Sequence, residues 1–205
     1  MDDSAIEPGA SLLPGTRLIS HRLLSRLECA DLRWQLAKST SVPSRVLQNG
    51  VRMLDQRSRR TKKLEASLEV SALVKEKLES FLPTVRDGLQ LQLRSCQTPQ
   101  FYRYDEGDFF GPHRDNYGRA HSPAEVLARK AAVILFLNDG RHDAEFVNHD
   151  AFEGGLLRLY DVVPGYPSWT VVPEAGTIVS FPTDVLHEVT AVTRGSRLTA
   201  VTWYV

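Results

Sequence analysis

The chain has 205 residues, of which 42% are hydrophobic and 24% are charged. These fractions are typical of a globular protein and exclude a disordered, collagen-like or membrane class. Lys and Arg together number 25, as do Asp and Glu, so the net charge is zero. That balance argues against a sequence-independent nucleic-acid clamp, which needs a strongly basic surface. We therefore expect one compact domain with a helical flank and no nucleic-acid partner.

Cysteine usage and the N-terminus indicate the compartment. The two cysteines, Cys29 and Cys96, are too few for a disulfide framework or a metal cluster, and we interpret them as reduced core thiols. The start, Met1-Asp2-Asp3, is acidic and is not followed by the basic and apolar regions of a signal peptide. No apolar run approaches the roughly 18 residues of a membrane span. The sequence predicts a cytoplasmic protein with no membrane partner.

Residues 1–97 are predicted to form a helical flank with a hairpin, packed on the core. Residues 1–15, rich in proline, glycine and small side chains, indicate a loose arm. Ser25 and Glu28 have the spacing of a capping box, in which each side chain accepts a hydrogen bond from the other residue's backbone. This signal and the apolar stripe after it predict a helix that ends near Lys38.

A hairpin signal and a basic run follow. Asn49-Gly50 between apolar residues predicts a hairpin within Val46–Leu54. Arg57–Lys63 (RSRRTKK) is interpreted as a solvated loop. The functional alternative is a rim that attracts an acidic substrate.

The rest of the flank has helical spacing. Leucine, valine and phenylalanine recur at this spacing over Leu64–Leu82, which predicts a long helix. Pro83 is expected to break that helix and to start a second one that ends at about Leu93.

From Thr98 the pattern changes to short strands separated by turn residues. The run Ala131–Asn138 (AAVILFLN) is apolar on both faces, as a central strand of a sandwich or barrel would be. About eight strands within 98–205, with no helices between them, predict a mostly β (α+β) fold, a jelly roll or barrel covered by the N-terminal helices. The predicted strands are Gln100–Tyr104, Phe109–Arg114, Ala131–Leu137, Leu156–Tyr160, Thr170–Val172, Thr177–Phe181, Glu188–Val192 and Arg197–Tyr204.

His113-Arg114-Asp115 is the first candidate for chemistry. Strand alternation directs residues i and i+2 to one face, so the imidazole and the carboxylate converge. A second inward histidine would complete the two-histidine, one-carboxylate set of non-haem Fe(II) oxygenases. His187 enters a late alternating strand and is the best third ligand. The other histidines precede the first helix or lie in polar, loop-like stretches: His21, His121, His142 and His149.

Arg197 follows His187 by ten residues. Alternation places it on one strand face with Thr199, Val201 and Trp203, so an arginine points the same way as apolar side chains. A buried guanidinium needs a partner, and a carboxylate is its natural bidentate complement. No acidic residue of that strand can serve, which indicates the carboxylate of a ligand.

Four motifs occur in order after Thr98. They are Tyr104–Asp115 (YDEGDFFGPHRD), Leu135–Asn138 (LFLN), Glu153–Leu156 (EGGL) and the pair His187 and Arg197. Together they resemble the prolyl 4-hydroxylase-like branch of the Fe(II)/2-oxoglutarate dioxygenases. The resemblance covers 98–205, and the helical N-terminal half is similar to that branch with weaker motifs.

The resemblance implies a double-stranded β-helix, a jelly roll, with a mononuclear iron site. The implied Fe(II) ligands are His113, Asp115 and His187. Arg197 would hold the distal carboxylate of the cosubstrate 2-oxoglutarate, helped by the Tyr104 hydroxyl and Thr199. The family's chemistry uses Fe(II), 2-oxoglutarate and O₂, with ascorbate as an optional addition. It decarboxylates 2-oxoglutarate to succinate and CO₂ and hydroxylates an aliphatic C–H bond.

Two residues bear on the subclass. Asp115 is present, whereas the family's halogenases lack this carboxylate, so the resemblance favours hydroxylation. The nucleic-acid demethylase branch carries a second arginine six residues before the last one. This chain has Ala191 there, which argues against a nucleic-acid demethylase.

The long segment Asp139–Glu153 between two motifs is interpreted as a lid or substrate-facing loop.

The substrate remains open at this stage. The leading hypothesis is hydroxylation of an amino-acid side chain in a protein or peptide, with proline suggested by the resemblance alone. The alternatives are a hydroxylase of a free amino acid or natural-product intermediate, and a non-catalytic, cupin-like metal-binding sensor. The sequence also leaves the oligomeric state open.

Overall fold

The computed structural model describes residues 15–48, 50–116, 122–140, 150–163 and 165–205. The predicted arm over 1–14, Asn49 and most of the 139–153 loop lie outside these residues, as do His121, His142 and His149.

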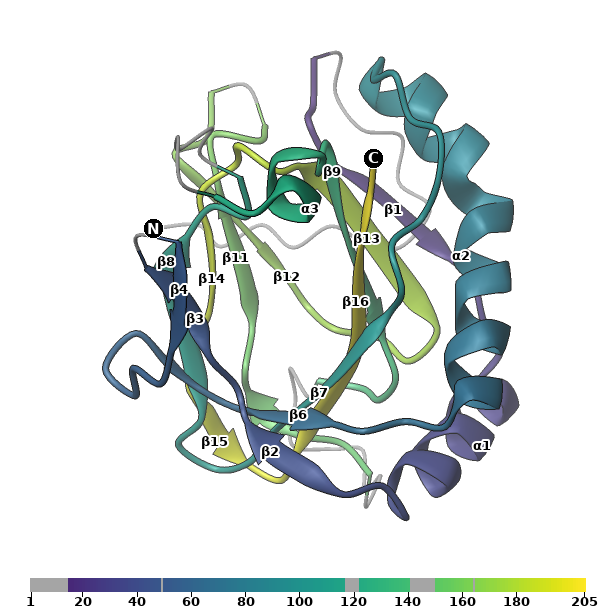
Figure 1. Ribbon diagram of the computed structural model, residues 1–205, viewed down its shortest axis with the longest axis vertical. Coiled ribbons are helices and arrows are strands. Elements are labelled where there is room, and N and C mark those ends of the chain that lie inside the picture. The colour runs from purple at the N-terminus through teal and green to yellow at the C-terminus, as the bar shows by residue number, and fades with distance from the viewer. Residues whose placement is uncertain (1–14, 49, 117–121, 141–149, 164) are drawn as a thin grey trace.

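Two antiparallel sheets face each other and form the body of the protein (Figure 1). The larger sheet has the strand order β1–β13–β9–β16–β7–β6–β2, and the smaller one has the order β12–β11–β14–β8–β5. The larger sheet comprises β1 (Ile19–Arg22), β2 (Ser41–Pro43), β6 (Lys62–Leu64), β7 (Gln100–Tyr104), β9 (Ala131–Phe136), β13 (Thr177–Pro182) and β16 (Arg197–Tyr204). The smaller sheet comprises β5 (Arg59–Arg60), β8 (Phe109–His113), β11 (Leu157–Tyr160), β12 (Ser168–Val171) and β14 (His187–Val189).

The eight predicted core strands are all present, with ends within a few residues of the prediction. The predicted strand Glu188–Val192 is divided between β14 and a short β15 (Val192–Arg194), which pairs with β10 (Glu153–Gly154). A short helix, α3 (Ala124–Leu127), lies between β8 and β9, so the expectation of no helices among the core strands is wrong. The mostly β jelly roll with N-terminal helices is confirmed.

Strand β9 shows how the layers are held together. All six of its residues are buried, as the run of apolar residues predicted. Ala132, Ile134 and Phe136 join the core between the two sheets. The alternate residues, Val133 and Leu135 among them, join the core on the opposite face, under the helices. A strand covered on both faces needs apolar side chains at every position.

Two helices cover the outer face of the larger sheet (Figure 1). α1 (Arg26–Leu36) begins with the predicted capping box: the Ser25 hydroxyl accepts from the Glu28 N–H (3.2 Å), and the Glu28 carboxylate accepts from the Ser25 N–H (2.8 Å). α2 (Leu68–Leu89) is the longer helix. In the described part of the chain, neither helix nor α3 combines the length and the apolarity that crossing a membrane requires.

Pro83 does not break the second helical region, contrary to the prediction. α2 continues through it to Leu89 and is capped by Gln90, which adopts a left-handed conformation with φ 55°. A proline inside a helix costs about 3 kcal/mol because it removes one backbone hydrogen bond. Here Phe81, Leu82 and Val85 are buried on both sides of Pro83, and this apolar stripe outweighs the local cost.

The basic run Arg57–Lys63 is not a solvated loop, which corrects the main interpretation of it. Its residues supply β5 and most of β6, which pair with β8 and β7, respectively. The hairpin before it is present as predicted, with β3 (Val46–Gln48) antiparallel to β4 (Val51–Met53). The flank therefore contributes strands to both sheets. The division of the chain at residue 97 stays a prediction.

Tyr204 ties α2 to the larger sheet, and this contact can be tested. Its buried hydroxyl donates a hydrogen bond to the carbonyl oxygen of Leu78 (2.5 Å). We expect Tyr204→Phe to lower the free energy of unfolding by about 1 kcal/mol, the net contribution of one such bond. Urea denaturation measures this, with Tyr166→Phe at an exposed position as control. Equal effects of the two substitutions would contradict a role of the hydroxyl in helix docking.

Candidate metal centre

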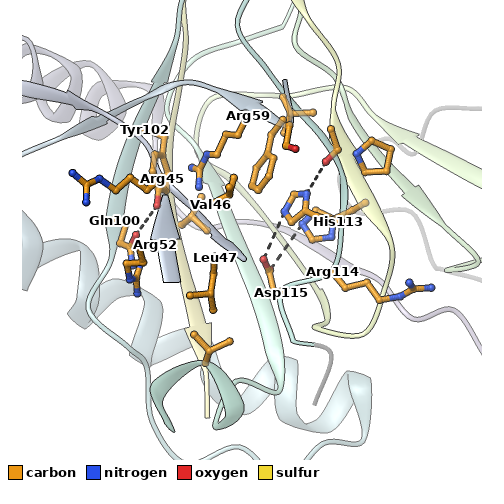
Figure 2. A pocket seen from close by; sticks show the side chains of 18 of the residues that line it. Arg45, Val46, Leu47, Arg52, Arg59, Gln100, Tyr102, His113, Arg114 and Asp115 are labelled. Atoms are coloured by element: carbon orange, nitrogen blue, oxygen red, sulfur yellow. Dashed lines mark hydrogen bonds and ion pairs between the residues drawn. The ribbon is translucent and has the colours of Figure 1, made fainter. Parts of the chain in front are cut away.

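Three metal-ligating side chains meet where β8 and β14 pair (Figure 2). His113 ends β8 and His187 begins β14, and the two stand directly opposite each other. The Asp115 carboxylate lies 3.7 Å from Nε2 of His113 and 3.9 Å from Nε2 of His187. One ligand atom from each of the three residues lies within 4.8 Å of the others. The structure thus brings together all three of the predicted iron ligands.

Asp115 reaches this point by a different route from the one predicted. β8 ends at His113, so strand alternation does not continue to Asp115. Its backbone is held instead by a hydrogen bond from its N–H to the carbonyl of Thr183 (3.1 Å). The loop between β13 and β14 therefore positions the carboxylate as well as leading into His187.

Backbone carbonyls fix the orientation of both imidazoles. Nδ1 of His113 lies 2.9 Å from the carbonyl oxygen of Gly111, and Nδ1 of His187 lies 3.1 Å from that of Val185. A carbonyl only accepts, so Nδ1 carries the proton in each ring. Both Nε2 atoms then keep their lone pairs for a metal, the usual arrangement of metal-binding histidines.

The protonation states also suit a cation. Burial, followed by the neighbouring His187, lowers the pKa of His113 to about 3. Burial alone would raise the pKa of the Asp115 carboxyl, but His187, His113 and the Trp203 N–H outweigh it, so its pKa lies below the ordinary value. At neutral pH the His113 ring is neutral and the carboxylate ionised, as metal binding requires.

Trp203 orients the carboxylate, a role that sequence reasoning missed. The indole Nε1–H donates to Oδ2 of Asp115 (2.8 Å). The Arg129 guanidinium lies 3.4 Å from the centre of the same indole ring. The available signal was alternation in β16, which puts Trp203 on the same face as Arg197.

Arg197 lies deep in the same region. It stands opposite Tyr104 in the β16–β7 pair, and only 1% of it is exposed. Its Nε and Nη2 have no hydrogen-bond partner among the described residues, and the Thr199 hydroxyl next to it on the strand face has none either. Burial lowers the pKa of the Arg197 guanidinium, although the Tyr104 hydroxyl acts in the opposite direction. The predicted cosubstrate residues therefore lie together, with unused donors.

The EGGL motif makes room for this arginine. Gly155 has φ +56°, and a Cβ added there would lie 3.1 Å from Cδ of Arg197 and 2.9 Å from Cγ2 of Val192. A larger residue would be strained in this left-handed conformation and would also press on the Arg197 side chain. The glycine therefore serves the site as well as the turn.

One cavity of about 550 Å³ connects these groups. Its wall includes the three metal-ligating residues, Arg197 and Tyr104. This volume falls within the range of small-molecule and cofactor sites. A metal bound by the triad and a carboxylate bound by Arg197 would therefore lie in the same cavity.

The indole contact yields a test of how the carboxylate is held. Trp203→Phe keeps the ring but removes the N–H, so we expect the affinity for Fe(II) to fall by about 10-fold or more. Anaerobic titration with Fe(II) measures this. Trp169→Phe is the matched control, since the Trp169 Nε1 has no partner among the described residues. Unchanged affinity in Trp203→Phe would show that Asp115 needs no such support.

Comparison with known proteins agrees with this geometry. Residues 99–205 match the family model of the 2OG-Fe(II) oxygenase superfamily. The chain is 30% identical over 182 residues to a PKHD-type hydroxylase of Shewanella oneidensis, covering 88% of this chain and 74% of that protein. It is 35% identical over 106 residues to a PKHD-type hydroxylase of Cupriavidus pinatubonensis, covering 51% of this chain and 41% of that protein.

Two solved structures show the same fold. A prolyl-4-hydroxylase of Pseudomonas putida superposes with a TM-score of 0.65 at 21% identity, covering 92% of each chain. A prolyl hydroxylase of Trichoplax adhaerens, in complex with a peptide fragment of hypoxia inducible factor, gives a TM-score of 0.67 at 20% identity, covering 93% of this chain and 83% of that one. The family match extends over more than half of the chain and includes every residue of the candidate site. The chain belongs to the 2OG-Fe(II) oxygenase superfamily.

Proposed function

We propose that the protein is an Fe(II)- and 2-oxoglutarate-dependent hydroxylase that acts on an aliphatic C–H bond of an amino-acid side chain. The observation that carries the proposal is the opening of one cavity onto both the His113–Asp115–His187 cluster and the unused donors of Arg197. Two histidines and one carboxylate with open positions are the ligand set of non-haem Fe(II) oxygenases. Membership of the superfamily supports the same conclusion.

The donors at Arg197 fit 2-oxoglutarate. A guanidinium that is buried without an acidic partner is unfavourable by several kcal/mol. A carboxylate can accept from two of its N–H groups at once, and the Thr199 hydroxyl can add a third bond. In this assignment His113, Asp115 and His187 hold the metal, while Arg197, Thr199 and Tyr104 hold the distal carboxylate of the cosubstrate.

The chain's own contribution to the reaction is geometry and shielding. Fe(II) with 2-oxoglutarate and O₂ supplies the oxidation of the C–H bond when these are bound, with release of succinate and CO₂. Gly111 and Val185 keep the two imidazole Nε2 atoms directed at the metal, and Trp203 keeps the carboxylate oriented. Arg197 holds the cosubstrate from the far end, between the rings of Tyr104 and Phe136 (4.9 and 5.4 Å from Cζ). These buried aromatic rings also keep water away from the site.

A peptide or protein is the proposed substrate class. The peptide-bound prolyl hydroxylase of the same fold supports it, and the names of the PKHD-type relatives support hydroxylation. The cavity volume also suits a free amino acid, which is the alternative. A non-catalytic sensor is less favoured because it would have no need of the donors at Arg197. We further propose a cytoplasmic location and no nucleic-acid substrate, in keeping with two free, buried cysteines and zero net charge.

The metal assignment predicts that each of the three ligands is required. His113→Ala, Asp115→Ala and His187→Ala should each lower Fe(II) affinity severely and abolish succinate formation, because each removes a ligand atom. Fe(II) titration and a succinate assay measure the two effects. His21→Ala is the matched control, since His21 lies in β1. Full Fe(II) occupancy and unchanged activity in Asp115→Ala would refute the ligand set.

The cosubstrate assignment predicts a graded loss at Arg197. A bidentate contact to a desolvated carboxylate is worth about 2–5 kcal/mol, or roughly 30- to several thousand-fold in affinity. Arg197→Ala should lose that affinity for 2-oxoglutarate, and Arg197→Lys should keep part of it because it retains the charge without the fork. Anaerobic titration of the Fe(II)-loaded protein, followed by the metal-to-ligand charge-transfer band, measures it.

Two controls make the Arg197 result specific. Fe(II) binding should survive in both variants, because Arg197 is not a metal ligand. Arg103→Ala changes an arginine of the neighbouring strand that pairs with Asp105, and it should leave 2-oxoglutarate affinity unchanged. If Arg197→Ala binds 2-oxoglutarate as tightly as the wild type does, the cosubstrate lies elsewhere.

A further inference from the structure

The cavity is strongly basic. Besides Arg197, six arginines line it, while Asp115 is the only acidic residue of the described lining. The six are Arg45, Arg52, Arg57, Arg59, Arg114 and Arg129. Fe(II), Asp115, Arg197 and the two carboxylates of 2-oxoglutarate together have zero net charge. The metal and cosubstrate therefore do not offset the charge of these six arginines.

Arg59 stands out because it is held inside the cavity. Its Cζ lies 4.4 Å from the centre of the Tyr102 ring and 4.4 Å from that of the Phe110 ring. Its Nε is buried and has no hydrogen-bond partner among the described residues. Phe110 in turn stacks on His113, with ring centroids 3.5 Å apart. Arg59 is thus separated from the metal cluster by a single aromatic ring.

The remaining arginines are engaged elsewhere or extend outward. Arg52 pairs with Glu125 (3.7 Å), and Arg129 donates to the side chain of Gln97 (3.2 Å). In Figure 2 the side chains of Arg45 and Arg114 extend away from the triad, whereas Arg59 lies between Tyr102 and the wall that carries His113. Arg57 is exposed.

The neighbours of Arg59 in the basic run do not share its position. Arg60 donates to the carbonyl of Gly107 and lies 3.5 Å from the Asp108 carboxylate, and Lys62 pairs with Asp105 (2.5 Å). The loop between β7 and β8 therefore supplies the partners of both cations. Of the cations in the run, Arg57 and Arg59 line the cavity. Arg59 stands opposite Phe110 in the β5–β8 pair.

We propose that Arg59 forms an anion subsite beside the metal centre and that the substrate carries a carboxylate close to the carbon that is hydroxylated. The inference rests on the proposed hydroxylase function and defines its substrate class. The rings of Tyr102 and Phe110 hold the guanidinium in one place, so little ordering is needed when a carboxylate binds. A single guanidinium matches the single charge of a carboxylate. The carboxylate belongs either to a free amino acid or to an acidic residue of a peptide.

Matched acid and amide substrates test the proposal on the Fe(II)-loaded full chain. Proline (acid) and prolinamide (amide) test a free amino acid as the substrate. N-acetylated, C-amidated Ala-Asp-Pro-Ala (acid) and Ala-Asn-Pro-Ala (amide) test a peptide and form the second arm of the experiment. In the wild type the acid should stimulate succinate formation with an apparent KM on the order of 10- to 100-fold below that of its amide, the usual range for a hydrogen bond to a charged group. The arm that shows this preference identifies the source of the carboxylate.

Variants distinguish a specific anion subsite at Arg59 from a general electrostatic attraction of the substrate to the basic cavity. Arg59→Gln should abolish the preference for the acid, and Arg59→Lys should retain part of it. Arg45→Gln removes the same charge from a side chain that points away, so it should keep the preference while the salt dependence of KM weakens. Anaerobic 2-oxoglutarate affinity should stay unchanged in Arg59→Gln, which also shows that the variant is folded.

Three results would overturn the inference, and they are distinguishable. An equal response to acid and amide in the wild type, including no response to either, refutes the proposed requirement for a substrate carboxylate. In that case, succinate formation without substrate still upholds the hydroxylase assignment. A loss of 2-oxoglutarate affinity in Arg59→Gln as large as in Arg197→Ala would place Arg59 in the cosubstrate site. No succinate formation by the loaded wild type under any condition would refute the proposed function itself.

Discussion

The pairing of β8 with β14 is the constraint on which the site depends. It places His113 opposite His187, so one register decides whether two imidazoles face the same point. A slip of one residue would turn one ring to the other face of the sheet. The register is protected on both sides: β14 also pairs with β11, and β8 with β5. The short edge strand β5 has the sequence of a basic loop, yet it helps to fix the position of His113 opposite His187.

The second constraint is the burial of Arg197. Its neighbours could have included an acidic partner, and a structural ion pair would then have satisfied the guanidinium permanently. Instead the rings of Tyr104 and Phe136 lie beside the guanidinium. Its Nε and Nη2 and the Thr199 hydroxyl have no hydrogen-bond partner among the described residues. Stability is lower for as long as these donors remain unpaired. A ligand carboxylate bound there would relieve that cost, so the proposed assignment links cosubstrate binding to the stability of the fold.

The sequence predicted the residues of the candidate site more accurately than it predicted the structure of the N-terminal flank. His113, His187 and Arg197 obey strand alternation, a local rule, and ordered spacing between motifs supported their grouping. Pro83 followed a local rule too, but burial of the stripe around it overrode that rule. Arg57–Lys63 has no apolar alternation to indicate a strand. Its residues form β5 and most of β6 because β8 and β7 offer unpaired backbone groups. Trp203 was placed on the right face, but its bond to Asp115 depends on a loop contact with Thr183 that no local pattern contains.

The β core and the N-terminal flank contribute different parts of the cavity. β7, β8, β14 and β16 carry every residue assigned to the metal and to 2-oxoglutarate except Asp115, which follows directly after β8. The rest of the cavity wall includes residues of the β3–β4 hairpin and of β5, all from the N-terminal flank. Among the described residues, the β3–β4 hairpin does not pair with β8 or β14, so a change there can alter the cavity wall without moving a residue of the triad. Arg59 sits at that junction: its strand supports β8 from outside, while its side chain lies one aromatic ring from His113. In the proposed assignment, the same residue connects the stability of the metal site with the selection of a substrate.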